Sequence, residues 1–221
     1  MRVLICDSNN WFSLQEQIKT KYEIKVVSNK EDLTLKSLKS FRPEFVFFVH
    51  WNWIVDKDIY ENYECIVFHT APLPYGRGGS PIQNLILEGF DTSPVCALKM
   101  TGELDAGPVY SQVEVNLSGT LTLIFSRICD AINQLIIEII DKRPYPKEQK
   151  GKAYIFKRLN KTDNEIPKGL SLKKIYDRVR MLDHEDYPNA YILYGDARIE
   201  FLNADLNEES LVLTCKITTS S

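Results

Sequence analysis

Short apolar runs alternate with polar, helix-like segments over about the first seventy residues. Four apolar runs lie at residues 1–6, 23–28, 43–51 and 64–70. Unbroken runs of this length are typical of strands buried on both faces of a parallel sheet. The segments between them favour helices and lie at residues 11–22, 29–42 and 56–63. This alternation predicts an α/β fold with a mostly parallel sheet.

The middle of the chain contains the longest regular segment. Apolar residues recur at helical spacing over residues 120–142, which predicts a helix with one buried face. The Pro- and Gly-rich segment 71–81 (APLPYGRGGSP) predicts a loop, because these residues interrupt regular structure. The other predicted elements are a helix, a strand, a loop and a strand at residues 82–90, 93–101, 102–108 and 109–117.

The character of the sequence changes after about residue 150. Residues 171–182 have the spacing of an amphipathic helix, and the segments around a Tyr-Gly-Asp turn alternate with the period of strands. The sequence therefore predicts a catalytic domain over residues 1–150. A small C-terminal subdomain, made of a helix and β-structure, is predicted over residues 151–221.

Composition narrows the functional class. The formal net charge of −3 argues against a nucleic acid as the main partner, because phosphate binding needs concentrated Lys and Arg. The five cysteines are scattered without metal-ligand spacing, which favours reduced thiols and no metal site. The N-terminus lacks the long apolar stretch of a signal peptide or membrane anchor. We therefore expect a cytoplasmic protein without a membrane partner.

Two residues have the chemistry of an acid/base pair. His69 ends the fourth apolar run, and Asp105 lies in the loop after the strand predicted at 93–101. Ligands of open α/β sheets bind at the carboxyl ends of strands, where we expect both residues to lie. A carboxylate beside an imidazole fixes its tautomer and favours its charged form. Each residue alone is more often structural, so the pair needs support from its surroundings.

The surrounding sequence supplies that support. The segments FHTAPLPYGRGGSPIQ and ALKMTGELDAGPVY closely resemble the formyltransferase family that uses N10-formyltetrahydrofolate. The residues that carry the resemblance are His69, Leu73, Pro74, Arg77, Gly78, Pro81, Ile82, Gln83, Asp105 and Gly107. The resemblance implies a Rossmann-like catalytic domain, and it extends more loosely to both ends of the chain.

The resemblance also implies a mechanism. An acceptor amine attacks the formyl carbon, and preorganised donors stabilise the resulting oxyanion. His69 would donate to this oxyanion and relay protons. Asp105 would hold His69 and accept a proton from the amine. The co-substrate would be N10-formyltetrahydrofolate, with no metal.

One position departs from the family pattern. The family has Asn two residues before the histidine, where this chain has Val67. Loss of a comparable oxyanion donor costs about 100–1000-fold in rate in other enzymes. Asn52 is the first candidate for a substitute donor and His50 the second. The alternative is that Asn52 is a loop residue between two tryptophans.

Further residues are candidates for binding. Aromatic and apolar walls suit a flat pterin ring, so the expected donor-binding residues are Trp51, Trp53, Gly102, Leu104 and Gly107. Core packing is an equal alternative for the tryptophans. Backbone amides and one guanidinium suit a phosphate, so the expected substrate-binding residues are Pro74, Tyr75, Gly76, Arg77, Gly78 and Gly79. Arg77 could instead pair with an acidic side chain.

Family members differ in their acceptor. The short tail and the negative net charge favour the amine of a nucleotide-linked amino sugar, as in bacterial surface-polysaccharide pathways such as the pseudaminic acid pathway. One alternative is an enzyme like the methionyl-tRNA formyltransferases, which needs a basic face. Another is a non-catalytic folate- or nucleotide-binding relative, suggested by Val67. The exposed edge of the β-rich tail favours a homodimer.

Overall fold

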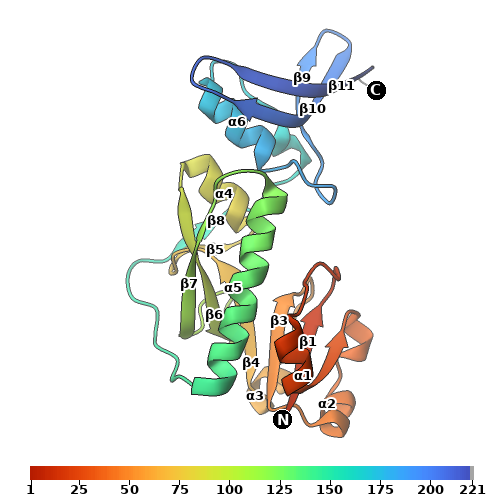
Figure 1. Ribbon diagram of the computed structural model, residues 1–221, viewed down its shortest axis with the longest axis vertical. Helices are drawn as coiled ribbons and strands as arrows, with labels where there is room; N and C mark the ends of the chain where they lie inside the picture. Colours follow the sequence, from red (N-terminus) through yellow and green to blue (C-terminus); the bar gives the residue numbers. More distant parts are fainter. Residues whose placement is uncertain (220–221) are drawn as a thin grey trace. The chain divides into compact units, whose positions relative to one another are not determined.

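The computed structural model describes residues 1–219, which form two compact units (Figure 1). The first unit contains Met1–Arg77, Pro94–Val115 and Ile128–Tyr154. The second unit contains Gly78–Ser93, Asn116–Arg127 and the chain from Ile155 onward. Each unit therefore combines segments from several parts of the sequence. The division into domains at about residue 150 stays a prediction.

The first unit is built on a six-stranded sheet with the order β2-β1-β3-β4-β6-β7. Its strands are β1 (Arg2–Asp7), β2 (Glu23–Val27), β3 (Phe45–His50), β4 (Cys65–Thr70), β6 (Thr92–Lys99) and β7 (Val109–Asn116). β1 pairs in parallel with β2 and β3, and β3 pairs in parallel with β4. The predicted α/β fold with a mostly parallel sheet is confirmed.

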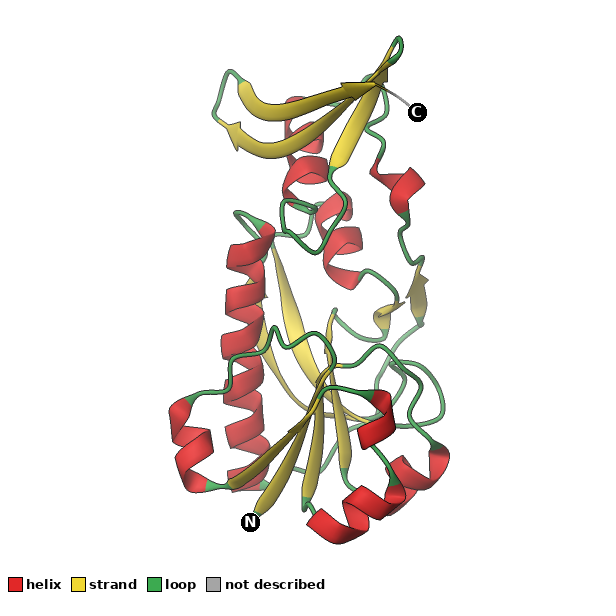
Figure 2. Cartoon of the chain, turned by 90° about the vertical axis from the view of Figure 1, so that its right-hand side faces the viewer, coloured by secondary structure: helices red, strands yellow, loops and turns green. Residues whose placement is uncertain are grey.

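Helices cover both faces of this sheet (Figure 2). They are α1 (Glu16–Lys21), the 3₁₀ helix η1 (Lys30–Asp32), α2 (Leu35–Phe41), α3 (Lys57–Asn62) and α5 (Leu121–Lys142). α1 lies along α5, where Lys21 pairs with Asp141 at 2.8 Å. α2 and α3 cover the opposite face, where Leu38 and Ile59 join the core. The helix predicted over 120–142 is confirmed, whereas the one predicted over 11–22 begins only at Glu16.

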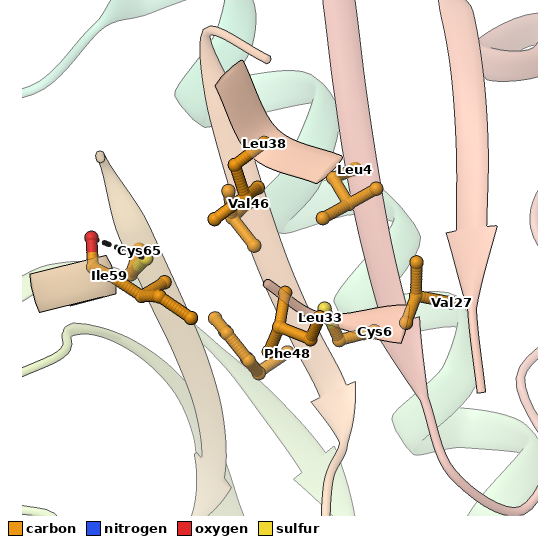
Figure 3. Close-up of a cluster of buried hydrophobic side chains, with 9 residues drawn as sticks. All are labelled: Leu4, Cys6, Val27, Leu33, Leu38, Val46, Phe48, Ile59 and Cys65. Atoms are coloured by element: carbon orange, nitrogen blue, oxygen red, sulfur yellow. Dashed lines mark hydrogen bonds between the residues drawn. The ribbon is translucent and has the colours of Figure 1, made fainter. Parts of the chain in front are cut away.

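The core on the α2 and α3 face is apolar and continuous (Figure 3). Its buried residues are Leu4, Cys6, Val27, Leu33, Leu38, Val46, Phe48, Ile59 and Cys65. Trp51, Val67 and Met100 are partly buried and pack against this cluster. Alternate residues of a strand share a face, so Cys65, Val67 and His69 point to this side of β4. The cluster therefore leads along β4 toward His69.

The direction of β6 differs from the expectation that His69 and Asp105 both follow the carboxyl ends of parallel strands. β6 pairs with β4 in the antiparallel direction, with Lys99 opposite Ile66 and Cys96 opposite His69. The loop after β6 therefore begins at the amino end of β4, not at its carboxyl end. It must fold back along the sheet to bring Asp105 to His69. Strand direction is set by tertiary pairing and leaves no mark in the local apolar pattern.

The segment predicted as a loop at 71–81 also contains a strand. β5 (Tyr75–Gly78) pairs with β8 (Tyr154–Phe156) in a two-stranded sheet. The backbone of Gly78 has φ +98, and a Cβ atom there would lie 2.9 Å from the Phe156 carbonyl oxygen. Glycine therefore permits a close approach of the two backbones, in a segment whose composition is that of a loop.

The second unit contains the C-terminal sheet, with the order β11-β10-β9. Its elements are α4 (Pro81–Glu88), the 3₁₀ helix η2 (Lys161–Asn164), α6 (Leu172–Arg180), β9 (Ala190–Tyr194), β10 (Ala197–Leu206) and β11 (Leu211–Thr219). β10 is antiparallel to both neighbours, which confirms the predicted helix and β-rich tail. Arg180 of α6 is buried and donates to Asp177 and to the carbonyl oxygens of Leu117 and Gly119. Over residues 1–219, no helix is long and apolar enough to cross a membrane.

Candidate active site

The structure brings His69 and Asp105 together. Nδ1 of His69 lies 3.5 Å from Oδ2 of Asp105, and the two side chains are only 7% and 9% exposed. Hydrogen bonds of catalytic pairs are often long in ligand-free proteins and shorten when substrates bind. The two residues predicted as an acid/base pair therefore have the contact that this role requires.

The second ring nitrogen of His69 is also engaged. Its Nε2 lies 2.7 Å from the carbonyl oxygen of Gly76. A carbonyl oxygen only accepts hydrogen bonds, so Nε2 must carry a proton. Nδ1 is then the nitrogen directed at the carboxylate of Asp105. The backbone of Gly76 has φ +85, a conformation that residues with a Cβ atom rarely adopt.

The loop that carries Asp105 is held at several points. Asp105 itself has φ +51, which is uncommon for a residue other than glycine. The side-chain amide of Gln149 donates to the carbonyl oxygens of Asp105 and Gly107, at 2.8 and 2.9 Å. A Cβ atom at Gly107 would collide with the Lys99 carbonyl oxygen. The backbone of this loop therefore lies tightly against the end of β6.

Arg77 has two protein partners. Its Nε and Nη2 donate to Oε1 of Gln149, at 3.1 and 2.9 Å. Its Nη1 lies 3.2 Å from Oε1 of Glu103. The pairing with an acidic side chain, considered as the alternative to phosphate binding, is therefore present.

The candidate oxyanion donors are Asn52 and His50. The contacts that the structure shows for them are with residues other than His69. The amide nitrogen of Asn52 donates to Oδ1 of Asn9, at 3.1 Å. Nδ1 of His50 lies 3.2 Å from the hydroxyl of Ser8. Val67 packs against the apolar cluster of the α2 and α3 face. An apolar wall therefore stands where the resemblance leads us to expect an amide.

The structure shows different surroundings for the expected donor-binding residues. Trp51 and Trp53 make an edge-to-face pair with ring centroids 4.9 Å apart. The indole nitrogen of Trp51 is buried without a hydrogen-bond partner. Leu104 is 71% exposed.

A hollow of about 860 Å³ opens in the same unit. Its lining includes Tyr60, Met100, Thr101 and Gly102. A Cβ atom at Gly102 would lie 3.2 Å from the Tyr60 hydroxyl, so the absence of a side chain keeps this wall open. Of the expected donor-binding residues, Gly102 is the one that lines the hollow.

The expected substrate-binding segment is packed against the chain around residue 154. The carbonyl oxygen of Pro74 accepts from the backbone of Tyr154, whose ring stacks on Tyr75 at 4.8 Å. In the second unit, a Cβ atom at Gly79 would lie 2.6 Å from Cβ of Arg158. These contacts account for the small residues by close packing.

The buried thiols beside the site are poor nucleophiles. Cys96 lies opposite His69 in the strand register, and Cys65 begins β4. Burial raises the pKa of each thiol to about 12. Reactive cysteines have a lowered pKa, so neither thiol is a candidate nucleophile. Within residues 1–219, His, Cys, Asp and Glu form no group of three or more suited to hold a metal ion.

Two groups of the site were not identified from the sequence. The carbonyl oxygen of Gly76 belongs to the backbone, and only the fold directs it at His69. Gln149 lies in the irregular polar segment KEQKGK, where periodicity and motif give no signal. The sequence therefore predicts the reacting pair but not what orients it.

Comparisons with known proteins agree with this geometry. Residues 3–140 match the formyl transferase family model, and residues 161–218 match the C-terminal domain of methionyl-tRNA formyltransferase. The methionyl-tRNA formyltransferase of Sulfurihydrogenibium sp. is 30% identical over 85% of this chain and 62% of its own length. The chain thus spans about three-fifths of that relative.

Solved structures show the same similarity. The methionyl-tRNA formyltransferase from Clostridium thermocellum is 38% identical, with a TM-score of 0.92 over 99% of both chains. The formyltransferase PseJ from Anoxybacillus kamchatkensis, in complex with a UDP-linked formamido sugar and tetrahydrofolate, is 20% identical. Its TM-score is 0.57 over 71% of this chain and 85% of its own.

These relatives correct the predicted acceptor. The nucleotide-linked amino sugar, the surface-polysaccharide role and the absence of a nucleic-acid partner are wrong, because the more similar relatives are methionyl-tRNA formyltransferases. The expectation that the tail is too short for such an enzyme is wrong, because residues 161–218 match the C-terminal domain of methionyl-tRNA formyltransferase. Net charge was also a poor guide to the acceptor, because it sums the charges of the whole chain and does not report the charge of any one face.

One assignment agrees with three observations: the contact of His69 with Asp105, the sheet that carries this pair, and the family match over most of β1 to α5. We conclude that this chain belongs to the formyl transferase family.

Proposed function

We propose that the chain transfers a formyl group from N10-formyltetrahydrofolate to the amino group of methionyl-tRNA. The observation that carries this proposal is the buried contact of His69 with Asp105, at 3.5 Å. It occurs in a chain similar over 99% of its length to a methionyl-tRNA formyltransferase. Cytoplasmic location follows as part of the proposal.

The pair can perform the proton transfers of this reaction. Asp105 accepts the proton that the amine loses as its nitrogen bonds to the formyl carbon. His69 donates a hydrogen bond to the oxygen that becomes an oxyanion. The bond between the formyl carbon and N10 then breaks, and the proton held by Asp105 passes to N10.

The apolar side of β4 suits the donor. Trp51 and Val67 continue from the core cluster along the face that carries His69. A flat pterin fits between such walls. We assign donor binding to this region, including Trp53, Leu104 and Gly107. Val67 then serves as a wall rather than as a donor.

The remaining expected roles stay proposals. Residues 74–79 would contact the acceptor near the reacting amine, and Asn52 would supply an oxyanion donor if its contact with Asn9 opens. A catalytic domain up to about residue 150 and a C-terminal subdomain would share the binding of the two substrates. A homodimer through the exposed edge of the tail is also part of this proposal.

Transfer of radiolabelled formyl from N10-formyltetrahydrofolate to initiator methionyl-tRNA tests the function. We expect formylmethionyl-tRNA with the natural chain and none with His69→Ala. Free methionine and a nucleotide-linked 4-amino sugar serve as comparison acceptors. Formylation of the sugar alone, or tight folate binding without transfer to any acceptor, would overturn the proposal.

A further inference from the structure

Gln149 connects the two segments that contact His69. One segment is β5, which supplies the Gly76 carbonyl oxygen to Nε2 of His69 and carries Arg77. The other is the loop after β6, which carries Asp105. The side chain of Gln149 bonds to both segments, on Arg77 and on the Asp105 backbone. All five residues lie within the first compact unit.

The chemistry of these contacts fixes the orientation of the amide. Oε1 of Gln149 faces two guanidinium nitrogens, which only donate. Nε2 faces the carbonyl oxygens of Asp105 and Gly107, which only accept. A flipped amide would set donor against donor and acceptor against acceptor. Each hydrogen-bonding position of the amide is therefore used in a single orientation.

The contacts close a ring around the reacting pair. It runs from His69 to Gly76, along the chain to Arg77, through Gln149 to Asp105, and back to His69. Asp105 also has φ +51, a conformation that persists only where the surroundings hold it. Gln149 holds the backbone at this point and two residues further on, through the carbonyl oxygens of Asp105 and Gly107. Its removal would free the Asp105 carboxylate to move away from Nδ1.

We propose that Gln149 is a positioning residue that holds the Asp105 carboxylate against His69. In this role it acts through the Asp105 loop and Arg77. The proposal rests on the proposed function, because the rate of formyl transfer is its principal readout. A displacement of about 1 Å at a reacting group lowers a rate by about a hundredfold.

Steady-state kinetics of Gln149→Ala form the first test. We expect kcat to fall about tenfold to hundredfold, with the KM for methionyl-tRNA changed by less than about threefold. Gln149→Glu should be no better than Gln149→Ala, because its second oxygen faces two carbonyl oxygens. Glu148→Ala, at the exposed neighbouring residue, is the matched control and should keep natural kinetics. A natural kcat in Gln149→Ala would overturn the proposal.

A double-mutant cycle separates positioning from general structural damage. If Gln149 acts through the carboxylate, Gln149→Ala should change kcat by less than about twofold when Asp105→Asn is already present. An equal loss in both backgrounds would overturn the proposal. Circular dichroism checks that each variant is folded.

Nitrogen-15 NMR of the histidines gives a readout that does not depend on activity. The chain has three histidines, and we expect Gln149→Ala to shift the ring resonances of His69 more than those of His50 and His184. Unchanged His69 resonances would overturn the inference about Gln149. If the natural chain formylates no methionyl-tRNA, the proposed function fails, and the NMR comparison still decides whether Gln149 orients the pair.

Discussion

Nε2 of His69 lies 2.7 Å from the carbonyl oxygen of Gly76, so one backbone group fixes which ring nitrogen faces Asp105. This contact requires the backbone of Gly76 to adopt φ +85. The tautomer of the histidine is therefore set by a glycine in β5, and the carboxylate completes the orientation from the other side.

Gly76→Ala should damage catalysis more than stability. A Cβ atom at positive φ costs about 1–2 kcal/mol, and relief of this strain would turn the carbonyl oxygen away from Nε2. We expect kcat to fall about tenfold or more. Gly169→Ala is the control, because Gly169 has φ +80 with open space around it. Equal losses of kcat in both variants would show that the contact with His69 is unimportant.

Asp105→Asn should lower kcat by about a hundredfold to ten-thousandfold, because general acid–base groups contribute this much. Donor affinity, measured by equilibrium binding of a folate analogue, should change little, since the amide keeps the size of the carboxyl group. Asp130→Asn, on an exposed position of α5, provides the comparison. A rate for Asp105→Asn within about threefold of the natural chain would contradict the assigned role.

Arg180→Met should destabilise the second unit by about 1–3 kcal/mol, because it removes one of the two ion-pair partners of the buried Asp177 carboxylate and leaves Lys173 as the other. Nη1 of Arg180 also satisfies the carbonyl oxygens of Leu117 and Gly119. Urea unfolding followed by circular dichroism measures the change. Lys174→Met, on the exposed side of α6, should change the free energy of unfolding by less than about 0.5 kcal/mol.

Thiol reactivity should separate the cysteines by burial. At about pH 8 the exposed Cys215 should react with a thiol reagent first, whereas Cys65 and Cys96, with pKa values raised to about 12, should react only after unfolding. Burial favours the protonated thiols in the folded state. Their contribution to stability is therefore complete below about pH 8.5 and declines at higher pH, where unfolded thiols ionise. Rapid native labelling of Cys96 would contradict this order.

The strands of the first unit could be predicted because each buried strand is a continuous apolar run. The direction of β6 could not, because its residues pair equally well either way until the neighbouring strand is known. β5 was missed because its glycines, which the close approach to β8 requires, are also the residues of turns. Local pattern therefore located the elements but not their pairing.

The contact of His69 with Asp105 could be predicted because both residues lie in segments that resemble a known family. Gln149 and the Gly76 carbonyl oxygen could not, because their roles depend on contacts between residues far apart in the sequence. The acceptor was predicted wrongly from net charge and tail length. Neither quantity describes the surface that a substrate meets.

The tryptophans have a practical consequence. The chain has three, Trp11, Trp51 and Trp53, and all precede β4. Trp51 and Trp53 lie edge to face with centroids 4.9 Å apart, close enough for their excited states to couple in near-ultraviolet circular dichroism. The protein thus has an intrinsic fluorophore pair beside the region assigned to the donor. Folate titrations can be followed by quenching without attaching a label.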